Sequence, residues 1–151
     1  MKFIRTFVLF LAVANLRGLA KAAESTNAKP ARTQMNITIG AATFTATLEE
    51  NPTATAFKAM LPMTVKMTEL NGNEKYFRFG KNLPTNAAIP GKIENGDLMI
   101  YGADTLVLFY KAFSTVYSYT RVGRIRDPAG LAAAVGAGNV SVTYELSRKE
   151  L

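Results

Sequence analysis

The feature that most constrains the fold is a series of short segments, from Met35 onward, in which apolar and polar residues alternate. Alternation with a period of two places one face of a strand in a core and the other toward water. Residues 35–39 and 44–48 are the first two such segments, and Gly40-Ala41 supplies the turn between them. The pattern predicts an antiparallel hairpin, and its repetition along the chain predicts a mainly β fold.

Two short helices are expected between the strands. The first begins at Asn51-Pro52, because Asn can cap free backbone N–H groups and Pro suits the first helical position. The second carries the same pair of signals, with Asp127 as the cap and Pro128 at the first position. Gly136 ends that helix.

The remaining strands are expected over residues 63–70, 74–79, 97–102, 105–113, 118–125 and 139–146. The segments at 97–102 and 105–113 are apolar enough to lie deep in the core, whereas residues 80–96, rich in Gly, Pro and Asn, predict a long irregular stretch. About eight strands and two short helices predict a closed or nearly closed β-barrel whose ends the helices cover.

Composition removes most catalytic chemistry. The chain contains no Cys, His or Trp residue, which excludes disulfides, thiol chemistry, His-based acid–base catalysis and metal sites built from imidazole or thiolate. The acidic residues do not follow the dense spacing of a calcium loop. We therefore expect neither a metal nor a cofactor.

The N-terminus differs from the rest of the chain. A positive start, an apolar run and small residues at Ala20 and Ala22 predict a secretory signal peptide over residues 1–22, too short in its core to span a bilayer. The alternative is an uncleaved amphipathic anchor. Residues 23–34 are small and polar and predict a flexible linker, so residues 35–151 form the predicted domain. We expect an exported protein, periplasmic or secreted, with no stable membrane span after cleavage.

Cleavage would also change the charge of the chain. The whole chain has a formal net charge of +7, whereas the part after residue 22 carries 14 basic and 11 acidic residues, a net charge of about +3. Its basic residues are scattered rather than clustered, so we expect no nucleic-acid partner.

Residues 106–125 form the candidate site. An apolar run that ends at Phe109 leads into a segment rich in aromatic and hydroxyl groups, and two arginines follow. Phe109 suits either a core or a pocket, and the tyrosines suit either an exposed sheet face or a binding site. We select Phe109, Tyr110, Phe113 and Tyr119 as ligand-binding candidates. Arg121 is the candidate catalytic donor, although arginines on strands are often solvated charges.

The order of the elements resembles the bacterial cyclophilin-like family, a group of small relatives of the cyclophilins, which are peptidyl-prolyl isomerases. The resemblance rests on "NPTATAFKAMLP", "NGDLMIYGADTLVLFY", "TRVGRI" and "DPAGLAAAVG", and covers residues 35–145. It implies a cyclophilin-like closed barrel. "VLFYK" resembles the cyclophilin phrase whose aromatic ring lines the proline pocket, and this alignment places Phe109 and Tyr110 there.

The chain departs from the cyclophilins at their catalytic phrase. The Phe-His-Arg phrase after the first helix is absent, Arg78 is the arginine nearby without matching its position, and the pocket Trp and His are missing. Turning a prolyl bond against a barrier of about 18–20 kcal/mol needs an apolar pocket and a donor that favours the twisted amide, but no nucleophile or metal. Arg121, beside Tyr119 on a hairpin expected to pair with Phe109 and Tyr110, is the remaining donor candidate.

Two functions are therefore compatible with the sequence. The first is a binding module that holds an extended peptide or a small ligand against Tyr110, Phe113, Tyr119 and Arg121. The second is a peptidyl-prolyl isomerase that acts on exported proteins. The missing phrase favours the first, and a structural domain of a larger assembly is a third alternative.

Overall fold

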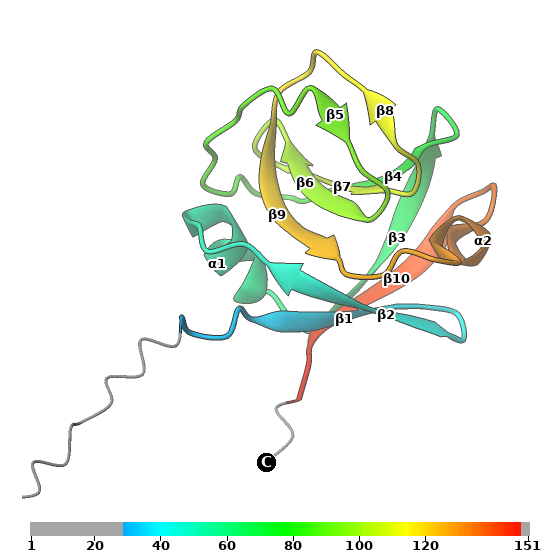
Figure 1. The fold of residues 1–151 in the computed structure, drawn as a ribbon, viewed down its shortest axis with the longest axis horizontal. Helices are drawn as coiled ribbons and strands as arrows, with labels where there is room; N and C mark the ends of the chain where they lie inside the picture. The colour runs from blue at the N-terminus through cyan, green and yellow to red at the C-terminus, as the bar shows by residue number, and fades with distance from the viewer. Residues whose placement is uncertain (1–28, 149–151) are drawn as a thin grey trace, which may run out of the picture. The chain divides into compact units, whose positions relative to one another are not determined.

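The structure, a computed structural model, describes residues 29–148 (Figure 1). The predicted signal peptide, residues 1–22, lies outside the described residues, as does the first half of the predicted linker. Within the described residues, eight antiparallel strands close into a barrel in the order β1-β10-β3-β4-β7-β6-β9-β2, which confirms the predicted fold class. The barrel strands are β1 Gln34–Ile39, β2 Ala42–Leu48, β3 Met63–Leu70, β4 Glu74–Arg78, β6 Asp97–Tyr101, β7 Thr105–Phe109, β9 Tyr119–Ile125 and β10 Val140–Leu146.

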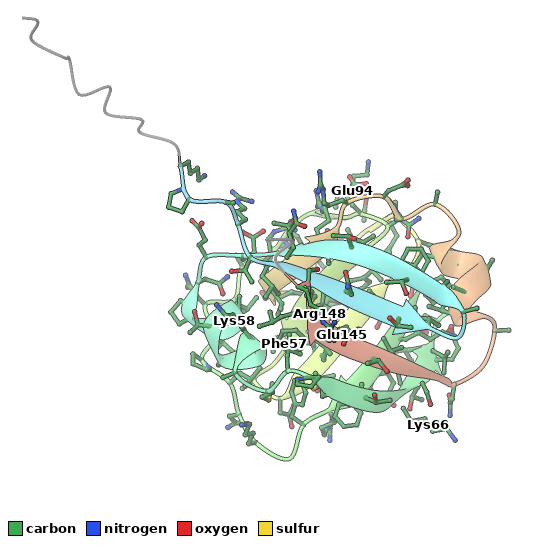
Figure 2. The ribbon with its side chains drawn as sticks, turned by 90° about the horizontal axis from the view of Figure 1, so that it is seen from below. Phe57, Lys58, Lys66, Glu94, Glu145 and Arg148 are labelled. Carbon is green, nitrogen blue, oxygen red and sulfur yellow. The ribbon has the colours of Figure 1, made fainter. Side chains whose placement is uncertain are left out.

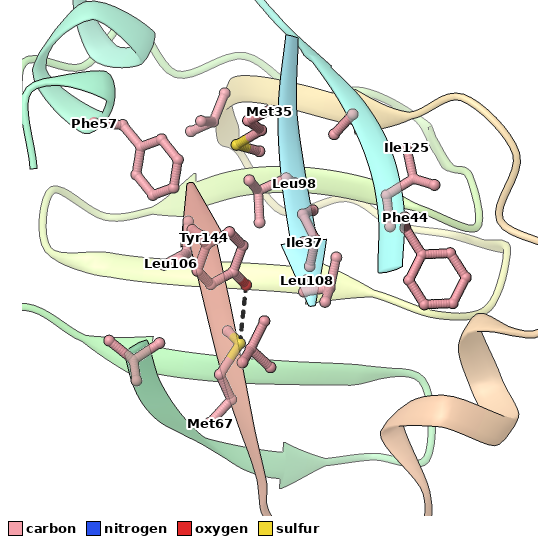
Figure 3. Close-up of a cluster of buried hydrophobic side chains, with 14 of the residues drawn as sticks. Met35, Ile37, Phe44, Phe57, Met67, Leu98, Leu106, Leu108, Ile125 and Tyr144 are labelled. Atoms are coloured by element: carbon pink, nitrogen blue, oxygen red, sulfur yellow. Dashed lines mark hydrogen bonds between the residues drawn. The ribbon is translucent and has the colours of Figure 1, made fainter. Parts of the chain in front are cut away.

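Along most barrel strands every second side chain points inward, and these side chains fill the interior of the barrel. Ile37, Leu98 and Leu106 are fully buried there, as Figure 3 shows. Tyr144 of β10 also points inward, and its hydroxyl donates a hydrogen bond to Met67 Sδ at 3.1 Å (Figure 3). A buried phenol needs such a partner, so Tyr144 contributes to the apolar packing without leaving its hydroxyl unsatisfied.

Helix α1, Pro52–Lys58, begins as predicted. The Asn51 side chain accepts a hydrogen bond from the backbone N–H of Ala54 at 2.7 Å, and Pro52 occupies the first turn. The helix directs Phe57 into the barrel core, where its ring meets Tyr144 edge-on with 5.7 Å between ring centroids (Figures 2 and 3). Capping and one large apolar contact therefore both hold a helix that is too short to be stable alone.

Helix α2, Leu131–Val135, begins later than predicted. Asp127 does not cap it; the Asp127 carboxylate instead accepts from the N–H of Ala129 at 3.1 Å in a preceding turn. Gly130 has φ of 82°, outside the helical region, so the helix cannot include the residues before it. Leu131 is buried in the core cluster, and α2 lies on the opposite side of the barrel to α1 (Figure 1). Neither helix in the described part of the chain could cross a membrane.

A second apolar layer covers the outer wall of the barrel. Strands β5, Lys92–Ile93, and β8, Phe113–Ser114, form a separate two-stranded sheet. Beneath it lies a buried cluster outside the barrel, made of Ile93, Met99, Val107, Phe109 and Tyr119. Strand β7 is therefore buried on both faces, which explains why its sequence is continuously apolar rather than alternating.

This layer corrects two boundaries. The strand predicted over residues 105–113 ends at Phe109, and the chain then crosses from the barrel wall to the outer layer before β8 begins. The stretch predicted to be irregular, residues 80–96, contains β5. Strands of two residues carry no periodicity in the sequence, so pattern could not reveal either one.

A β-bulge changes the direction of side chains on β9. The pairing of β9 with β6 shifts between Leu98 and Met99, so that Leu98 lies opposite Gly123 and Met99 opposite Arg121. Across the other edge, a Cβ on Gly123 would lie 2.6 Å from the backbone oxygen of Thr47 on β2, so this close approach requires glycine. The extra residue in β9 alters the alternation downstream of Arg121.

Candidate functional site

A cleft of about 660 Å³ that is lined by several aromatic side chains opens on the outer wall of the barrel, and it is named here the tyrosine cleft. It lies between β4 and β7 on one side and the segment that contains β8 on the other. Its lining residues come from five strands, one turn and the 113–117 segment: Leu70, Asn71, Asn73, Glu74, Tyr76, Arg78, Tyr101, Thr105, Val107, Phe113, Ser114, Thr115, Val116, Tyr117 and Tyr119.

A connected series of aromatic rings builds one wall of the cleft. Phe109 packs against Phe113 and Tyr119, with ring centroids 5.6 and 5.5 Å apart. Tyr119 meets Tyr101 at 5.7 Å, and Tyr101 meets Tyr117 at 6.3 Å. Phe109 and Tyr119 are buried and Phe113 is partly buried, whereas Tyr101 and Tyr117 are exposed at the rim. These ring contacts hold the rim tyrosines in place while their outer surfaces stay exposed.

Strand β4 supplies the opposite wall and gives the cleft two charged ends. Glu74, Tyr76 and Arg78 share the outer face because they are two residues apart, and they pair across with Phe109, Val107 and Thr105 of β7. At about 3.3 Å per residue, Glu74 and Arg78 are separated by about 13 Å along the strand. The cleft therefore has an acidic end, an aromatic centre and a basic end.

The two end charges differ in environment. Arg78 is exposed and lies 3.8 Å from Asp104, measured from Nε to Oδ2. Glu74 is only 9% exposed, and burial raises the pKa of its carboxyl, with a further rise from the nearby Glu69 charge. Asn73 lines the same end, and its Oδ1 is buried without a hydrogen-bond donor among residues 29–148. The acidic end thus carries acceptors that lack donors.

The cleft also borders an open strand edge. Strand β8 pairs with β5 along one edge, no other described strand pairs with β8, and both of its residues line the cleft. The N–H of Thr115 donates to Gly91 O at 2.9 Å, on the β5 side. Backbone groups alternate in direction along a strand, so the N–H and C=O of Ser114 point the other way. They are available to a second strand.

The structure brings together two of the predicted site residues. Phe113 and Tyr119 both line the tyrosine cleft. Phe109 lies directly beneath them but is fully buried, so the core alternative describes its environment and its ring supports the wall from behind. Whether any of these side chains binds a ligand stays a prediction.

Tyr110 does not lie with them. Its side chain belongs to the cluster inside the barrel, because it follows Phe109, which faces outward. Its hydroxyl donates to Glu69, and Lys75 Nζ lies 5.3 Å from its ring centroid. Burial, together with the hydrogen bond to Glu69, raises the pKa of Tyr110 to about 12. The expectation that Tyr110 shares one cleft with Tyr119 and Arg121 is wrong.

Arg121 also lies outside the tyrosine cleft. Strand β9 pairs with β6 and β2, not with β7 as predicted, so Arg121 is displaced by one strand from Phe109. Its Nη1 is 3.8 Å from Oδ1 of the fully buried Asp97, which Arg124 Nε contacts at 2.6 Å. The bulge in β9 allows both arginines to face one carboxylate. Arg121 lines a neighbouring groove of about 440 Å³ that includes Pro52 at the start of α1. Tyr119 lines this groove as well, so Tyr119 and Arg121 share it, as expected, whereas Tyr110 does not line it.

Sequence reasoning missed several cleft residues, chiefly Tyr76, Tyr101, Glu74 and Arg78. The signal available for β4 was its alternation, which places Glu74, Tyr76 and Arg78 on one face. That this face borders a cleft depends on β8, which the sequence did not reveal. Among the described residues, no group of three or more carboxylate side chains is arranged to hold a metal ion.

Comparisons with known proteins agree with this architecture. A model of the cyclophilin-like family matches residues 37–145. The fold is similar to the solution structure of a hypothetical protein from Archaeoglobus fulgidus, with a TM-score of 0.52 and 22% sequence identity, over 77% of this chain and 95% of that one. A search of curated proteins gives no match. Because the family model spans most of the barrel from β1 to β10, the chain belongs to the cyclophilin-like family.

Proposed function

We propose that this domain binds an extended peptide in the tyrosine cleft. The observation that carries the proposal is the open edge of β8 beside an aromatic cleft, with the backbone groups of Ser114 directed toward it. An added strand would hydrogen-bond to such an edge, and its alternate side chains would enter the cleft. The proposal includes export, which rests on the predicted signal peptide at residues 1–22.

The lining chemistry supports a peptide. Tyrosines offer large, rigid contact areas at a low cost in side-chain entropy, and their hydroxyls can bond to peptide groups. Val107 and Phe113 provide apolar floor between the two charged ends. A small ligand would use these walls alone, whereas a peptide would also use the β8 edge.

Removing the rim should test the proposal. Tyr101 and Tyr117 are exposed, so replacing both with Ala should leave the fold intact and weaken peptide binding about tenfold or more. The measurement is a titration of the purified chain with pools of blocked pentapeptides, followed by tyrosine NMR signals and by thermal shift. Ile89→Ala is the control, because Ile89 is exposed but lines the neighbouring groove.

Backbone methylation separates a peptide from a small ligand. Pentapeptides with alternate N-methyl groups keep their side chains but cannot donate hydrogen bonds to the β8 edge. We expect these peptides to lose most of their affinity. Equal binding of methylated and unmethylated peptides would contradict strand addition, and absence of binding by every pool would contradict the function.

Peptidyl-prolyl isomerisation is a second candidate, favoured by one observation. Arg78 lines the same cleft as the apolar residues Val107 and Phe113, which places a guanidinium beside a surface that could hold a proline ring. Such a donor could favour the twisted amide. The test is a proline-containing chromogenic tetrapeptide: acceleration that disappears in Arg78→Ala but persists in Arg121→Ala would assign the donor to this cleft. Loss only in Arg121→Ala would support the donor predicted from sequence, and a rate equal to buffer would exclude the activity.

A further inference from the structure

The acidic end of the tyrosine cleft holds a carboxylate that no side chain among residues 29–148 neutralises. Glu74 is 9% exposed, and no hydrogen bond or ion pair from the described residues 29–148 reaches its side chain. Burying an uncompensated charge is unfavourable, so such a group is normally paired or hydrogen-bonded. The charge that acts on Glu74 is that of a second carboxylate, Glu69, which raises the pKa of Glu74 further.

The groups around Glu74 suit a cation. Tyr76 and Tyr119 line the cleft beside it, and the faces of tyrosine rings attract a positive charge. Burial and the Glu74 charge both raise the pKa of the Tyr119 hydroxyl. Asn73 adds an acceptor oxygen without a donor among the described residues. An ammonium group supplies three donors and a positive charge, whereas a neutral or acidic group leaves these acceptors unsatisfied.

We propose that the acidic end of the cleft is a subsite for an alkylammonium group, carried by a lysine side chain of the bound peptide. The proposal rests on the peptide-binding function and specifies which peptides the cleft prefers. The ammonium bonds to the Glu74 carboxylate, and the four methylene groups of the lysine pack against Tyr76 and the neighbouring apolar wall. The exposed Arg78, about 13 Å away along β4, lies too far from Glu74 to occupy this place itself.

The experiment compares three pools of blocked pentapeptides that share randomised flanks and differ at the central residue, which is lysine, norleucine or glutamate. Norleucine keeps the aliphatic chain of lysine without its charge. Binding to the purified chain is titrated through the NMR signals of the cleft tyrosines. We expect the lysine pool to bind about tenfold more tightly than the norleucine pool, and the glutamate pool to bind most weakly.

Two variants identify the carboxylate. Glu74→Gln keeps the size of the side chain and should bring the lysine pool to the affinity of the norleucine pool. Glu94→Gln removes the same charge from a half-exposed side chain that pairs with Lys92 at 3.1 Å and does not line the cleft (Figure 2). It should retain the full preference for lysine. Circular dichroism and melting temperature establish that both variants are folded.

The outcomes separate the subsite from the function. Equal binding of the lysine and norleucine pools, or a lysine preference that survives in Glu74→Gln, overturns the subsite while peptide binding stands. If no pool perturbs the cleft tyrosines, peptide binding itself fails and the subsite with it. If n-butylamine alone binds as tightly as the lysine pool, the peptide part is overturned, because the cleft then recognises a free amine.

Discussion

Two consecutive residues of β4, Glu74 and Lys75, carry opposite charges into opposite faces of the barrel wall. Both are nearly buried, with 9% and 0% of the residue exposed. Lys75 Nζ donates three hydrogen bonds, to Glu69 at 3.1 Å, Gly136 O at 2.7 Å and Gly138 O at 2.6 Å. Glu74 receives no bond from the described residues. The described residues therefore supply hydrogen-bond partners for the Lys75 ammonium but none for the Glu74 carboxylate.

The difference separates a structural charge from a candidate binding charge. Lys75 ties the segment after α2 to the β3–β4 hairpin, so the ion and its partners stabilise the arrangement together. Glu74 makes no such connection and destabilises the fold while it is ionised, since burial raises its pKa. A buried charge without a partner beside a cleft is a sign of function rather than of architecture.

The largest expected effect comes from removing the structural charge. Lys75→Met keeps most of the side chain but removes the ammonium that donates to Glu69 and to two backbone carbonyls, and should lower the free energy of unfolding by about 3 kcal/mol. Urea denaturation measures the change. Lys66→Met is the matched control: Lys66 is an exposed lysine of β3, and its loss should change stability by less than about 0.5 kcal/mol. Similar effects of the two substitutions would contradict the structural role.

A smaller loss is expected from the partner of this cluster. Tyr110→Phe removes the hydroxyl that donates to Glu69 while it keeps the ring beneath Lys75, and should lower the free energy of unfolding by about 1–2 kcal/mol. The spectroscopic check is the tyrosine titration: burial and Glu69 hold the pKa of Tyr110 at about 12, so the wild type should lose a late-titrating tyrosine signal on substitution. An unchanged titration curve would argue against the hydrogen bond.

Neutralising Glu74 should stabilise the fold, in contrast to the loss expected for Lys75. Glu74→Gln should raise the free energy of unfolding at pH 7 by about 0.5–1 kcal/mol, because it removes a buried, ionised and unpaired group. Since the folded-state pKa is raised, the gain should shrink as the pH falls through it and vanish below the unfolded value of about 4.3. The titratable groups whose charge interacts with Glu74 are Glu69, Tyr110 and Tyr119, and Tyr76 lines the cleft beside it.

Glu69 should show the reverse dependence. Burial raises its pKa, but the bonds from Tyr110 and Lys75 outweigh this effect, so its net pKa is lowered. Its contribution to stability is therefore present above the unfolded pKa and is lost as the pH falls through the folded value. Urea denaturation of the wild type and of Glu74→Gln, repeated at intervals on the order of one pH unit between pH 3 and 7, measures how the free energy of unfolding depends on pH with and without the Glu74 carboxylate. A stability gain in Glu74→Gln that persists at pH 3 would show that Glu74 ionisation is not its cause.

The smallest expected effect tests whether the Lys75 cluster and the Glu74 site are independent. Tyr110→Phe should change the ratio of lysine-pool to norleucine-pool affinity by less than about twofold, because Tyr110 lies on the inner side of the wall and does not line the tyrosine cleft. The pentapeptide titration measures this ratio. A large change would mean that the two charges of β4 are coupled rather than independent.

Much of the fold follows from pattern alone. Alternation located the strands, and Asn51-Pro52 located the start of α1, because both signals depend on neighbours along the chain. The same pair of signals at Asp127-Pro128 predicted the start of α2 too early. The positive φ of Gly130 keeps the residues before it out of the helix. Strands β5 and β8 escaped prediction because two residues are too few to show a period.

The candidate site was predictable only in part. Phe113 and Tyr119 were identified from their aromatic, hydroxyl-rich segment, and both line the cleft. Arg121 and Tyr110 were expected beside them because β9 was assumed to pair with β7. Arg121 shares the neighbouring groove with Tyr119 but does not line the tyrosine cleft, and Tyr110 lines neither. The actual partner is β6, and a bulge redirects Arg121 toward Asp97. Strand order and bulges are set by contacts between distant segments, so neighbouring positions in a sequence do not reveal them.

The amino-acid sequence by itself determined the alternation, the mainly β class and the absence of His and Cys chemistry. It also determined that Glu74 and Lys75 face opposite sides of one strand, because successive side chains of a strand must do so. Only the tertiary structure decided that Lys75, and not Glu74, has hydrogen-bond partners among the described residues. Solvation depends on which remote segments cover a side chain, and here the loop after α2 satisfies Lys75 while β8 and its flanking chain leave a cleft over Glu74.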